Sequence, residues 1–257
     1  MVVKWPQLTP SLSVWEQMPS PHFPHPQASS GSSSRQSPSA RVALGIAAAL
    51  AALVLVFLII GSGLSTWRGS GFRANGPELP RLKHVLALEP GMSIADVGAG
   101  NGELTVALAT EIGSRGRVYS TDIDPQSLEH VRAAVAAVRL ANVTLVQSQA
   151  RDTRLPANCC DAIVLRRVYH HLTDPAAINA TLLRALRPGG VLAIIDFPPL
   201  LSGVWPLNHG ADARRVTEEV VASGFELVQI IEEWPGRGPL ASYCAVFSKR
   251  RDSQESW

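Results

Sequence analysis

The stretch Ile94-Ala-Asp96-Val-Gly98-Ala-Gly100-Asn-Gly102 decides the fold of this chain. A short apolar run ends at Val97, glycines follow at alternate positions, and a pattern with helical spacing begins at Gly102. Glycine permits a tight backbone turn and lets a ligand approach the amide groups at the N-terminus of a helix. The stretch therefore predicts a strand, a ligand-binding turn and a helix, in that order.

The residues around the glycines indicate which kind of ligand the turn binds. A dinucleotide-binding turn has the pattern G-x-G-x-x-G, whereas Glu103 stands where the third glycine of that pattern is expected. A carboxylate at this helix start is poorly suited to a pyrophosphate. Asp96, just before the glycines, can attract an ammonium group directly or through water. The turn thus favours a zwitterionic or cationic ligand over a phosphate.

Short apolar runs, fit for buried strands, alternate with helical patterns along the rest of the chain. The runs lie at 93–97, 117–122, 143–148, 161–165 and 190–196, and helical patterns lie at 102–112, at 125–140, after Asp174-Pro175 and around 211–223. Two later runs, 225–233 and 241–248, predict a hairpin. Because alternating strands and helices form parallel sheets covered on both faces, we expect an α/β fold. This fold is a Rossmann-like, doubly wound, mostly parallel seven-stranded sheet with an antiparallel edge hairpin.

The N-terminal part of the chain differs in composition from the rest. Residues 1–40 are crowded with Pro and Ser and predict a disordered tail. The 19 residues 42–60 carry no charge, and a helix of that length, at ~1.5 Å per residue, spans roughly the ~30 Å hydrocarbon core of a bilayer. We therefore expect a single transmembrane helix within 41–64, a flexible linker at 65–76 and one folded domain at 77–257.

The apolar segment 42–60 has an alternative interpretation as a secretory signal peptide. A signal peptide has a shorter apolar stretch close to the N-terminus, which favours the membrane anchor. More Lys and Arg residues follow the segment than precede it. The positive-inside bias therefore favours a single-pass membrane protein whose C-terminal domain faces the cytoplasm.

Charge and cysteine content argue against several classes of protein. The chain has 23 Lys and Arg against 21 Asp and Glu, a net charge of +2, so it has no strong field that would attract nucleic acid. Its three cysteines, Cys159, Cys160 and Cys244, form neither a disulfide framework nor a Cys/His metal spacing. We expect no nucleic-acid partner, no metal site and no specific protein partner.

The quoted pattern D-x-G-x-G-x-G resembles motif I of the class I S-adenosylmethionine-dependent methyltransferases. Three further stretches resemble motifs of this family in the same order: Val118-Tyr-Ser-Thr-Asp122-Ile-Asp124, Gln149-Ala-Arg-Asp152-Thr-Arg-Leu-Pro156 and Leu186-Arg-Pro-Gly-Gly-Val-Leu. The resemblance covers about residues 79–250. It implies methyl transfer as the activity and S-adenosyl-L-methionine as the cofactor.

The resemblance also implies roles for individual residues. The cofactor-binding residues would be Asp96, Gly98, Gly100, Gly102, Asp122, Ile123 and Asp152. Asp122 would accept hydrogen bonds from the ribose hydroxyls. Asp152 or the neighbouring backbone would face the exocyclic amine of adenine. Asp124, directly before Pro125, fits a helix N-cap better than a ribose ligand.

Residues after the fourth expected strand are the catalytic candidates. Methyl transfer depends mainly on positioning and needs a base only where the acceptor must lose a proton. The segment Arg166-Arg-Val-Tyr169-His170-His171 lies at the sheet edge where open α/β folds bind ligands. We expect His170 as a base and Tyr169 as a pocket residue, with hydrogen-bonded structural roles as the alternatives. His209 could close over the pocket or contact a helix N-terminus. A metal pair is not expected, because adjacent histidine side chains are expected to diverge.

These features together predict a membrane-tethered enzyme that transfers a methyl group by in-line displacement to a small-molecule or lipophilic acceptor. The anchor alone suggests that the acceptor is lipophilic. One alternative is a catalytically silent, membrane-anchored module that binds the cofactor. Another is a nicotinamide-dependent reductase, against which Glu103 argues.

Overall fold

The computed structural model describes residues 72–73, 76–199, 209–235 and 242–251. The chain divides into two units, Met1–Leu64 and Ser65–Trp257, and all described residues belong to the second unit. The expected tail at 1–40 and the expected transmembrane segment at 42–60 lie outside the described residues. Among the residues that the structure describes, no helix has both the length and the apolar character needed to cross a bilayer.

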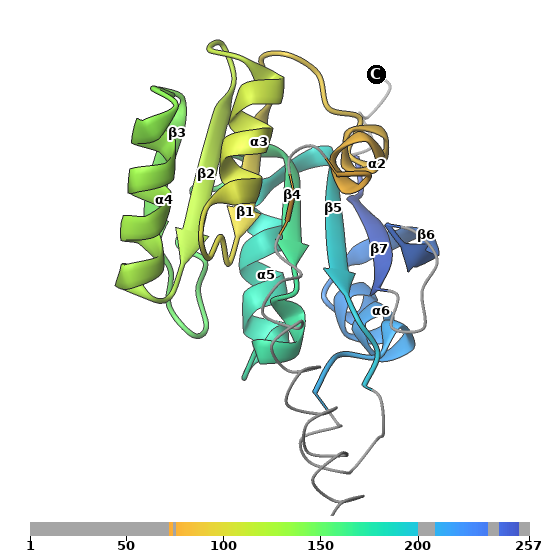
Figure 1. Ribbon diagram of the computed structural model, residues 1–257. Helices are drawn as coiled ribbons and strands as arrows, with labels where there is room; N and C mark the ends of the chain where they lie inside the picture. Colours follow the sequence, from red (N-terminus) through yellow and green to blue (C-terminus); the bar gives the residue numbers. More distant parts are fainter. Residues whose placement is uncertain (1–71, 74–75, 200–208, 236–241, 252–257) are drawn as a thin grey trace, which may run out of the picture. The chain divides into compact units, whose positions relative to one another are not determined.

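Seven strands form one sheet in the second unit (Figure 1). They are β1 (Ser93–Val97), β2 (Arg117–Asp122), β3 (Val143–Gln147), β4 (Cys160–Arg166), β5 (Leu186–Asp196), β6 (Phe225–Trp234) and β7 (Ser242–Lys249). The strand order is β3-β2-β1-β4-β5-β7-β6. Strands β1 to β5 pair in parallel, whereas β7 pairs antiparallel with both β5 and β6. The predicted mostly parallel seven-stranded sheet with an antiparallel edge hairpin is confirmed.

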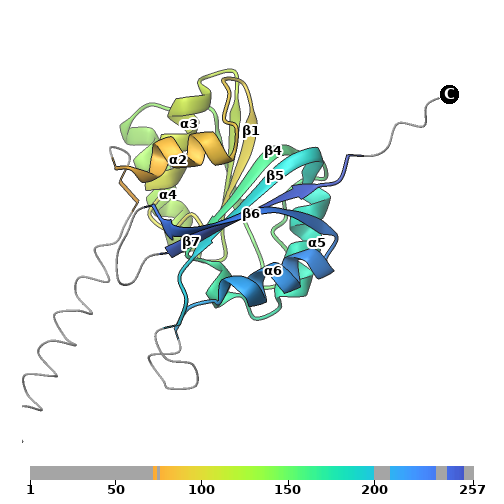
Figure 2. The ribbon, with the colours of Figure 1, turned by 90° about the vertical axis from the view of Figure 1, so that its right-hand side faces the viewer.

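Helices cover both faces of this sheet (Figure 2). They are α2 (Glu78–Val85), α3 (Glu103–Ile112), α4 (Pro125–Ala137), α5 (Pro175–Ala185) and α6 (Ala213–Ala222). One apolar core lies between α2, α3 and the sheet and includes Leu82 and Leu108. The other lies between α5, α6 and the opposite face and includes Leu182 and Val216. Each helix therefore buries one apolar stripe, which is the expected arrangement of a doubly wound fold.

Local signals explain where several elements begin. The side chain of Asp124 accepts hydrogen bonds from the backbone N–H groups of Gln126 and Ser127, which confirms the predicted N-cap of α4. Asp174 caps α5 in the same way. Strand β5 begins at Leu186, earlier than the predicted residue 190, because Leu186 already pairs with Cys160 of β4.

The strand order places one edge of the sheet in position to bind ligands. The chain leaves β1 toward β2 on one side, whereas β4 pairs on the other side of β1. The order of strands thus reverses between β1 and β4, and open α/β sheets bind ligands at the carboxyl ends of the strands at such a point. The loops after β1, β2, β4 and β5 carry the residues discussed below.

Candidate active site

The glycine turn after β1 is held against the neighbouring strand. Gly98, Gly100 and Gly102 have φ angles of 75°, 56° and 82°, in the left-handed region that favours glycine. The backbone N–H groups of Gly98 and Ala99 donate to the carbonyl oxygen of Thr121, at 2.8 and 3.0 Å. A Cβ on Gly102 would lie 2.9 Å from the backbone of α4, whereas a Cβ on Gly100 would meet nothing within 4 Å. The turn is closely packed at Gly102 and open at Gly100.

Asp122 connects the glycine turn to the loop after β2. Its Oδ2 accepts a hydrogen bond from the backbone N–H of Gly100 at 2.9 Å, and its Oδ1 accepts one from Asp124 at 3.0 Å. A carboxylate oxygen can accept more than one hydrogen bond, so Asp122 retains capacity for ribose hydroxyls. The next residue, Ile123, is 56% exposed, so its apolar side chain is accessible to a ligand, and its contact with the cofactor stays a prediction. The open Gly100, the carboxylate and this apolar surface together fit S-adenosylmethionine.

Asp96 is buried beneath the glycine turn. Its Oδ2 accepts a hydrogen bond of 2.6 Å from Thr105, whose hydroxyl also contacts Ser120. Burial raises the pKa of Asp96 to about 6, while the Thr105 hydrogen bond and the charge of Arg166 act in the opposite direction. A cation bound at the turn would favour the ionised form. The role of Asp96 toward an ammonium group stays a prediction.

The carboxylate of Asp152 accepts hydrogen bonds from other groups of the protein. Its Oδ1 accepts hydrogen bonds from the backbone N–H of Arg154 at 2.9 Å and from the Arg184 guanidinium at 3.2 Å. Arg184 lies on α5, so the carboxylate is tied to that helix. The backbone groups of Asp152 pair with those of Gln149. The predicted contact of Asp152 with adenine stays a prediction. No local pattern around Asp152 indicates Arg184 as its partner, because that residue lies on a separate helix.

Tyr169 points into the protein rather than toward an acceptor. Its hydroxyl donates to Glu219 at 3.0 Å and accepts from Asn179 at 2.9 Å, and the residue is 3% exposed. Burial raises the pKa of this phenol, so it stays protonated at neutral pH. Because Asn179 lies on α5 and Glu219 on α6, Tyr169 ties these two helices together. These contacts fit the structural alternative, and the predicted role of Tyr169 as a pocket residue stays a prediction.

His170 is oriented by a buried carboxylate. Its Nδ1 lies 2.8 Å from Oδ1 of Asp196, and its backbone N–H donates to Oδ2 of the same residue at 3.1 Å. The side chains are 3% and 0% exposed. Because a carboxylate accepts hydrogen bonds, Nδ1 carries the proton in neutral His170 and the Nε2 lone pair is left for another partner. Sequence reasoning missed Asp196, although an acid that ends the apolar run of β5 was visible.

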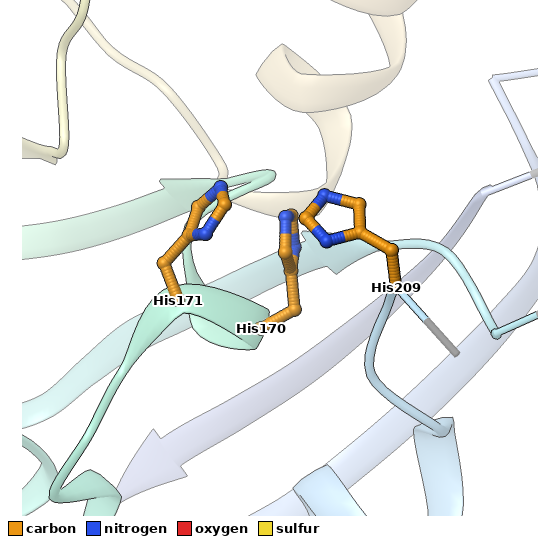
Figure 3. A group of neighbouring side chains, drawn as sticks. All are labelled: His170, His171 and His209. Atoms are coloured by element: carbon orange, nitrogen blue, oxygen red, sulfur yellow. The ribbon is translucent and has the colours of Figure 1, made fainter. Parts of the chain in front are cut away.

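Two further histidine rings lie against His170. Figure 3 shows His170 between His171 and His209. The ring centroid of His170 lies 3.9 Å from that of His171 and 4.5 Å from that of His209. The expectation that adjacent histidines diverge is wrong here, because the tight 3₁₀ turn η1 (Tyr169–His171) brings both rings together.

The backbone near Gly210 fixes the position of His209. Gly210 has a φ of 134°, and a Cβ there would lie 2.6 Å from the carbonyl oxygen of Phe197. The backbone N–H of Ala211 donates to that same carbonyl oxygen at 2.9 Å. The segment at 209–211 is therefore pressed against the end of β5. The structure places the His209 ring beside that of His170, and its predicted role in closing over a pocket stays a prediction.

The histidines and the glycine turn are neighbours. A Cβ added to Gly98 would clash with the side chain of Val168, which directly precedes η1. Only a glycine at this position lets the two loops approach so closely. The cofactor-binding turn and the histidines thus lie on adjoining parts of the same sheet edge.

This fold and this site define a class I methyltransferase domain. Residues 95–194 match a family of methyltransferase domains. The chain is 32% identical over 114 residues to the ubiquinone/menaquinone biosynthesis C-methyltransferase UbiE of Shewanella frigidimarina. That match covers 44% of this chain and 45% of the relative, so the chain spans a little under half the length of this relative.

Solved structures show the same fold. An S-adenosylmethionine-dependent methyltransferase from Aquifex aeolicus superposes with a TM-score of 0.59 at 22% identity, covering 66% of this chain and 89% of that chain. The [4+2]-cyclase SpnF superposes with a TM-score of 0.60 at 16% identity, covering 68% and 80%. The matched residues 95–194 and the shared fold support a class I S-adenosylmethionine-dependent methyltransferase domain, a class of enzyme domains that uses S-adenosylmethionine as its cofactor.

Proposed function

We propose that this protein transfers the methyl group of S-adenosylmethionine to a lipophilic acceptor that carries an aromatic hydroxyl group. The observation that carries the proposal is the buried pair of His170 and Asp196, which adjoins the glycine turn through Val168. A hydroxyl on an aromatic ring becomes a strong nucleophile, at oxygen or at a ring carbon, only after it loses its proton. A histidine held by a carboxylate is suited to accept that proton.

The roles of the protein groups follow from their hydrogen bonds. When bound, S-adenosylmethionine supplies an electrophilic methyl group on a sulfonium sulfur. Nε2 of His170 accepts the hydroxyl proton, and Asp196 stabilises the resulting imidazolium through Nδ1–H. The electron pair of the acceptor forms the new bond to carbon while the carbon–sulfur bond breaks and its electrons remain on sulfur. His170 then releases its proton to water.

Two observations support the class of acceptor. The uncharged residues 42–60 are long enough for a bilayer span, and an anchor would keep the domain beside acceptors dissolved in the membrane. The relative from Shewanella frigidimarina is by name a C-methyltransferase of ubiquinone and menaquinone biosynthesis, whose products are lipophilic. We therefore propose a single-pass protein with its domain on the cytoplasmic side, where it acts on a quinol or a related lipophilic phenol.

The test uses the full chain in lipid nanodiscs with S-adenosylmethionine labelled in its methyl group. We expect label to enter a lipophilic quinol or phenol in preference to a water-soluble analogue of equal ring structure. The variant His170→Gln should bind the cofactor normally and lose transfer by about 10²- to 10⁴-fold, the range typical of a lost general base. His130→Gln, at an exposed histidine of α4, is the matched control.

Two outcomes contradict the proposal. Equal transfer to soluble and membrane-partitioned acceptors would contradict the proposed preference for a lipophilic acceptor. Tight cofactor binding without transfer to any member of a broad panel would favour the silent binding module, or a different reaction on the same fold, as the cyclase SpnF illustrates.

A further inference from the structure

We propose that His170, His171 and His209 together bind one divalent transition-metal ion. One ligand nitrogen from each of the three rings can be chosen so that all three atoms lie within 4.8 Å of one another. The rings come from two separate loops, η1 after β4 and the segment before α6, and Figure 3 shows them side by side with His170 in the middle.

The chemistry of the three side chains indicates which ions fit. Neutral imidazole is a good ligand for Zn²⁺, Fe²⁺, Co²⁺ and Ni²⁺ and a poor one for Mg²⁺ or Ca²⁺, which prefer oxygen. Three protein ligands leave at least one coordination position for water or substrate, as in catalytic zinc sites. A three-histidine site therefore fits a catalytic ion with an open coordination position rather than a structural ion whose ligands are all protein groups.

Asp196 supplies the partner that a metal-binding histidine requires. Such a histidine usually donates its second ring N–H to a carboxylate or carbonyl oxygen, which fixes both the tautomer and the ring orientation. Nδ1 of His170 lies 2.8 Å from Oδ1 of Asp196, so Nε2 is the atom turned to the ion. The carboxylate also balances part of the positive charge that the ion would bring into this buried position.

The third ligand lies next to backbone that is held against the end of β5. The close approach of Gly210 to Phe197 and the hydrogen bond from Ala211 to the same carbonyl fix the loop that carries His209. The side chains of His171 and His209 belong to exposed residues, whereas that of His170 is enclosed. The cluster is thus accessible to an ion from solvent and fixed at its inner end.

The ion would deepen the proposed function, on which this part of the inference rests. A hydroxyl bound to a divalent ion has a lowered pKa, so the ion activates the acceptor directly and its proton leaves to water. This replaces proton transfer to Nε2 of His170, because that lone pair is then bound to the ion. The acceptor class implied is an aromatic hydroxyl that can coordinate a metal through oxygen.

Metal binding is measured on the full chain, treated with a chelator and then titrated with Zn²⁺ by calorimetry and with Co²⁺ by visible absorption. We expect one ion per chain and a Co²⁺ spectrum of low coordination number with nitrogen ligands. His209→Ala should weaken binding by at least about tenfold, and Asp196→Asn by about 10- to 100-fold, the range typical of lost outer-shell partners. His130→Ala is the matched control, and unchanged binding of S-adenosylmethionine verifies that each variant is folded.

The two proposals fail in distinguishable ways. Zn²⁺ binding that His209→Ala leaves unchanged, or no binding by the folded full chain, would overturn the metal site. Full methyl transfer by chelator-treated protein would overturn the role of the ion in activating the acceptor and leave His170 as the proton acceptor of the proposed function. Binding of one ion that depends on His209, without methyl transfer to any acceptor, would support the metal site and overturn the proposed function.

Discussion

Replacing Asp96 by asparagine is expected to stabilise the folded domain at neutral pH. Burial raises the pKa of this carboxyl group to about 6 from its ordinary value of 3.8. A carboxyl group whose pKa is higher in the folded state stabilises the fold below the pKa of the unfolded state and loses this contribution as the pH rises through the folded-state pKa. At pH 7.5 the wild-type domain therefore carries an unfavourable buried charge that asparagine lacks.

The size of the effect follows from the two pKa values. A rise from 3.8 to about 6 corresponds to ~3 kcal/mol at ~1.36 kcal/mol per pKa unit. We expect the free energy of unfolding of Asp96→Asn to exceed that of the wild type by about 1–3 kcal/mol at pH 7.5, and the gain to fall to about a third by pH 4.5. Urea unfolding followed by circular dichroism at both pH values measures it.

The same substitution should weaken the cofactor site. An ionised Asp96 attracts the positive charges of S-adenosylmethionine, and the neutral amide does not. We expect the Kd to rise by about tenfold, equivalent to one charge-assisted interaction of ~1.5 kcal/mol. Calorimetric titration of the same samples tests whether stability and binding change in opposite directions.

Asp124→Asn is a control for which the free energy of unfolding is expected to change in the opposite direction. Hydrogen bonds from the backbone N–H of Gln126 and the Ser127 hydroxyl lower the pKa of Asp124, so its ionised form favours the fold above the unfolded pKa and this contribution is lost in acid. This variant should be less stable than the wild type at pH 7.5. An Asp96→Asn variant that is equally or less stable at pH 7.5, or whose gain does not shrink in acid, would refute the reasoning about burial.

Three further substitutions test the packing and the cofactor site. Gly98→Ala should lower the melting temperature more than Gly91→Ala, because both positions have positive φ but only the Cβ at Gly98 would clash with a neighbouring side chain. Trp234→Phe removes the indole N–H that donates to buried Glu78 at 3.0 Å, and urea unfolding should show a loss of about 1–3 kcal/mol. Asp122→Ala should weaken binding of S-adenosylmethionine by about 10- to 100-fold in calorimetry, since hydrogen bonds to a charged group contribute ~1.5–3 kcal/mol.

The parts of the fold with local signals could be predicted from the sequence. The apolar runs that became β1 and β4 begin and end within one residue of the observed strands, because burial on both faces requires a nearly continuous apolar sequence. The Asp124 cap was predictable because an N-cap depends on side-chain chemistry and on residues within one turn. The glycine turn was predictable for the same reason.

The histidine cluster could not be predicted, because it depends on contacts between loops. His209 lies close to His170 only because Gly210 lets its loop press against the end of β5, and no periodicity in the sequence reports that approach. The divergence expected of adjacent histidines holds for extended backbone and fails in a tight 3₁₀ turn. The hydrogen-bond partners of Tyr169 could not be predicted for a related reason, since they come from α5 and α6.

The family match covers only part of the folded domain, so some residues of the candidate site lie inside the matched region and others lie outside it. The matched residues 95–194 include the glycine turn, Asp122 and His170, but they end before Asp196 and His209. The predicted cofactor-binding residues at the ends of β1 and β2 therefore lie in the shared part. The groups that orient and complete the histidine cluster come from the end of β5 and the segment after it. Acceptor choice must accordingly be tested on these residues of this chain, because the relatives fix the methyl donor and leave the acceptor open.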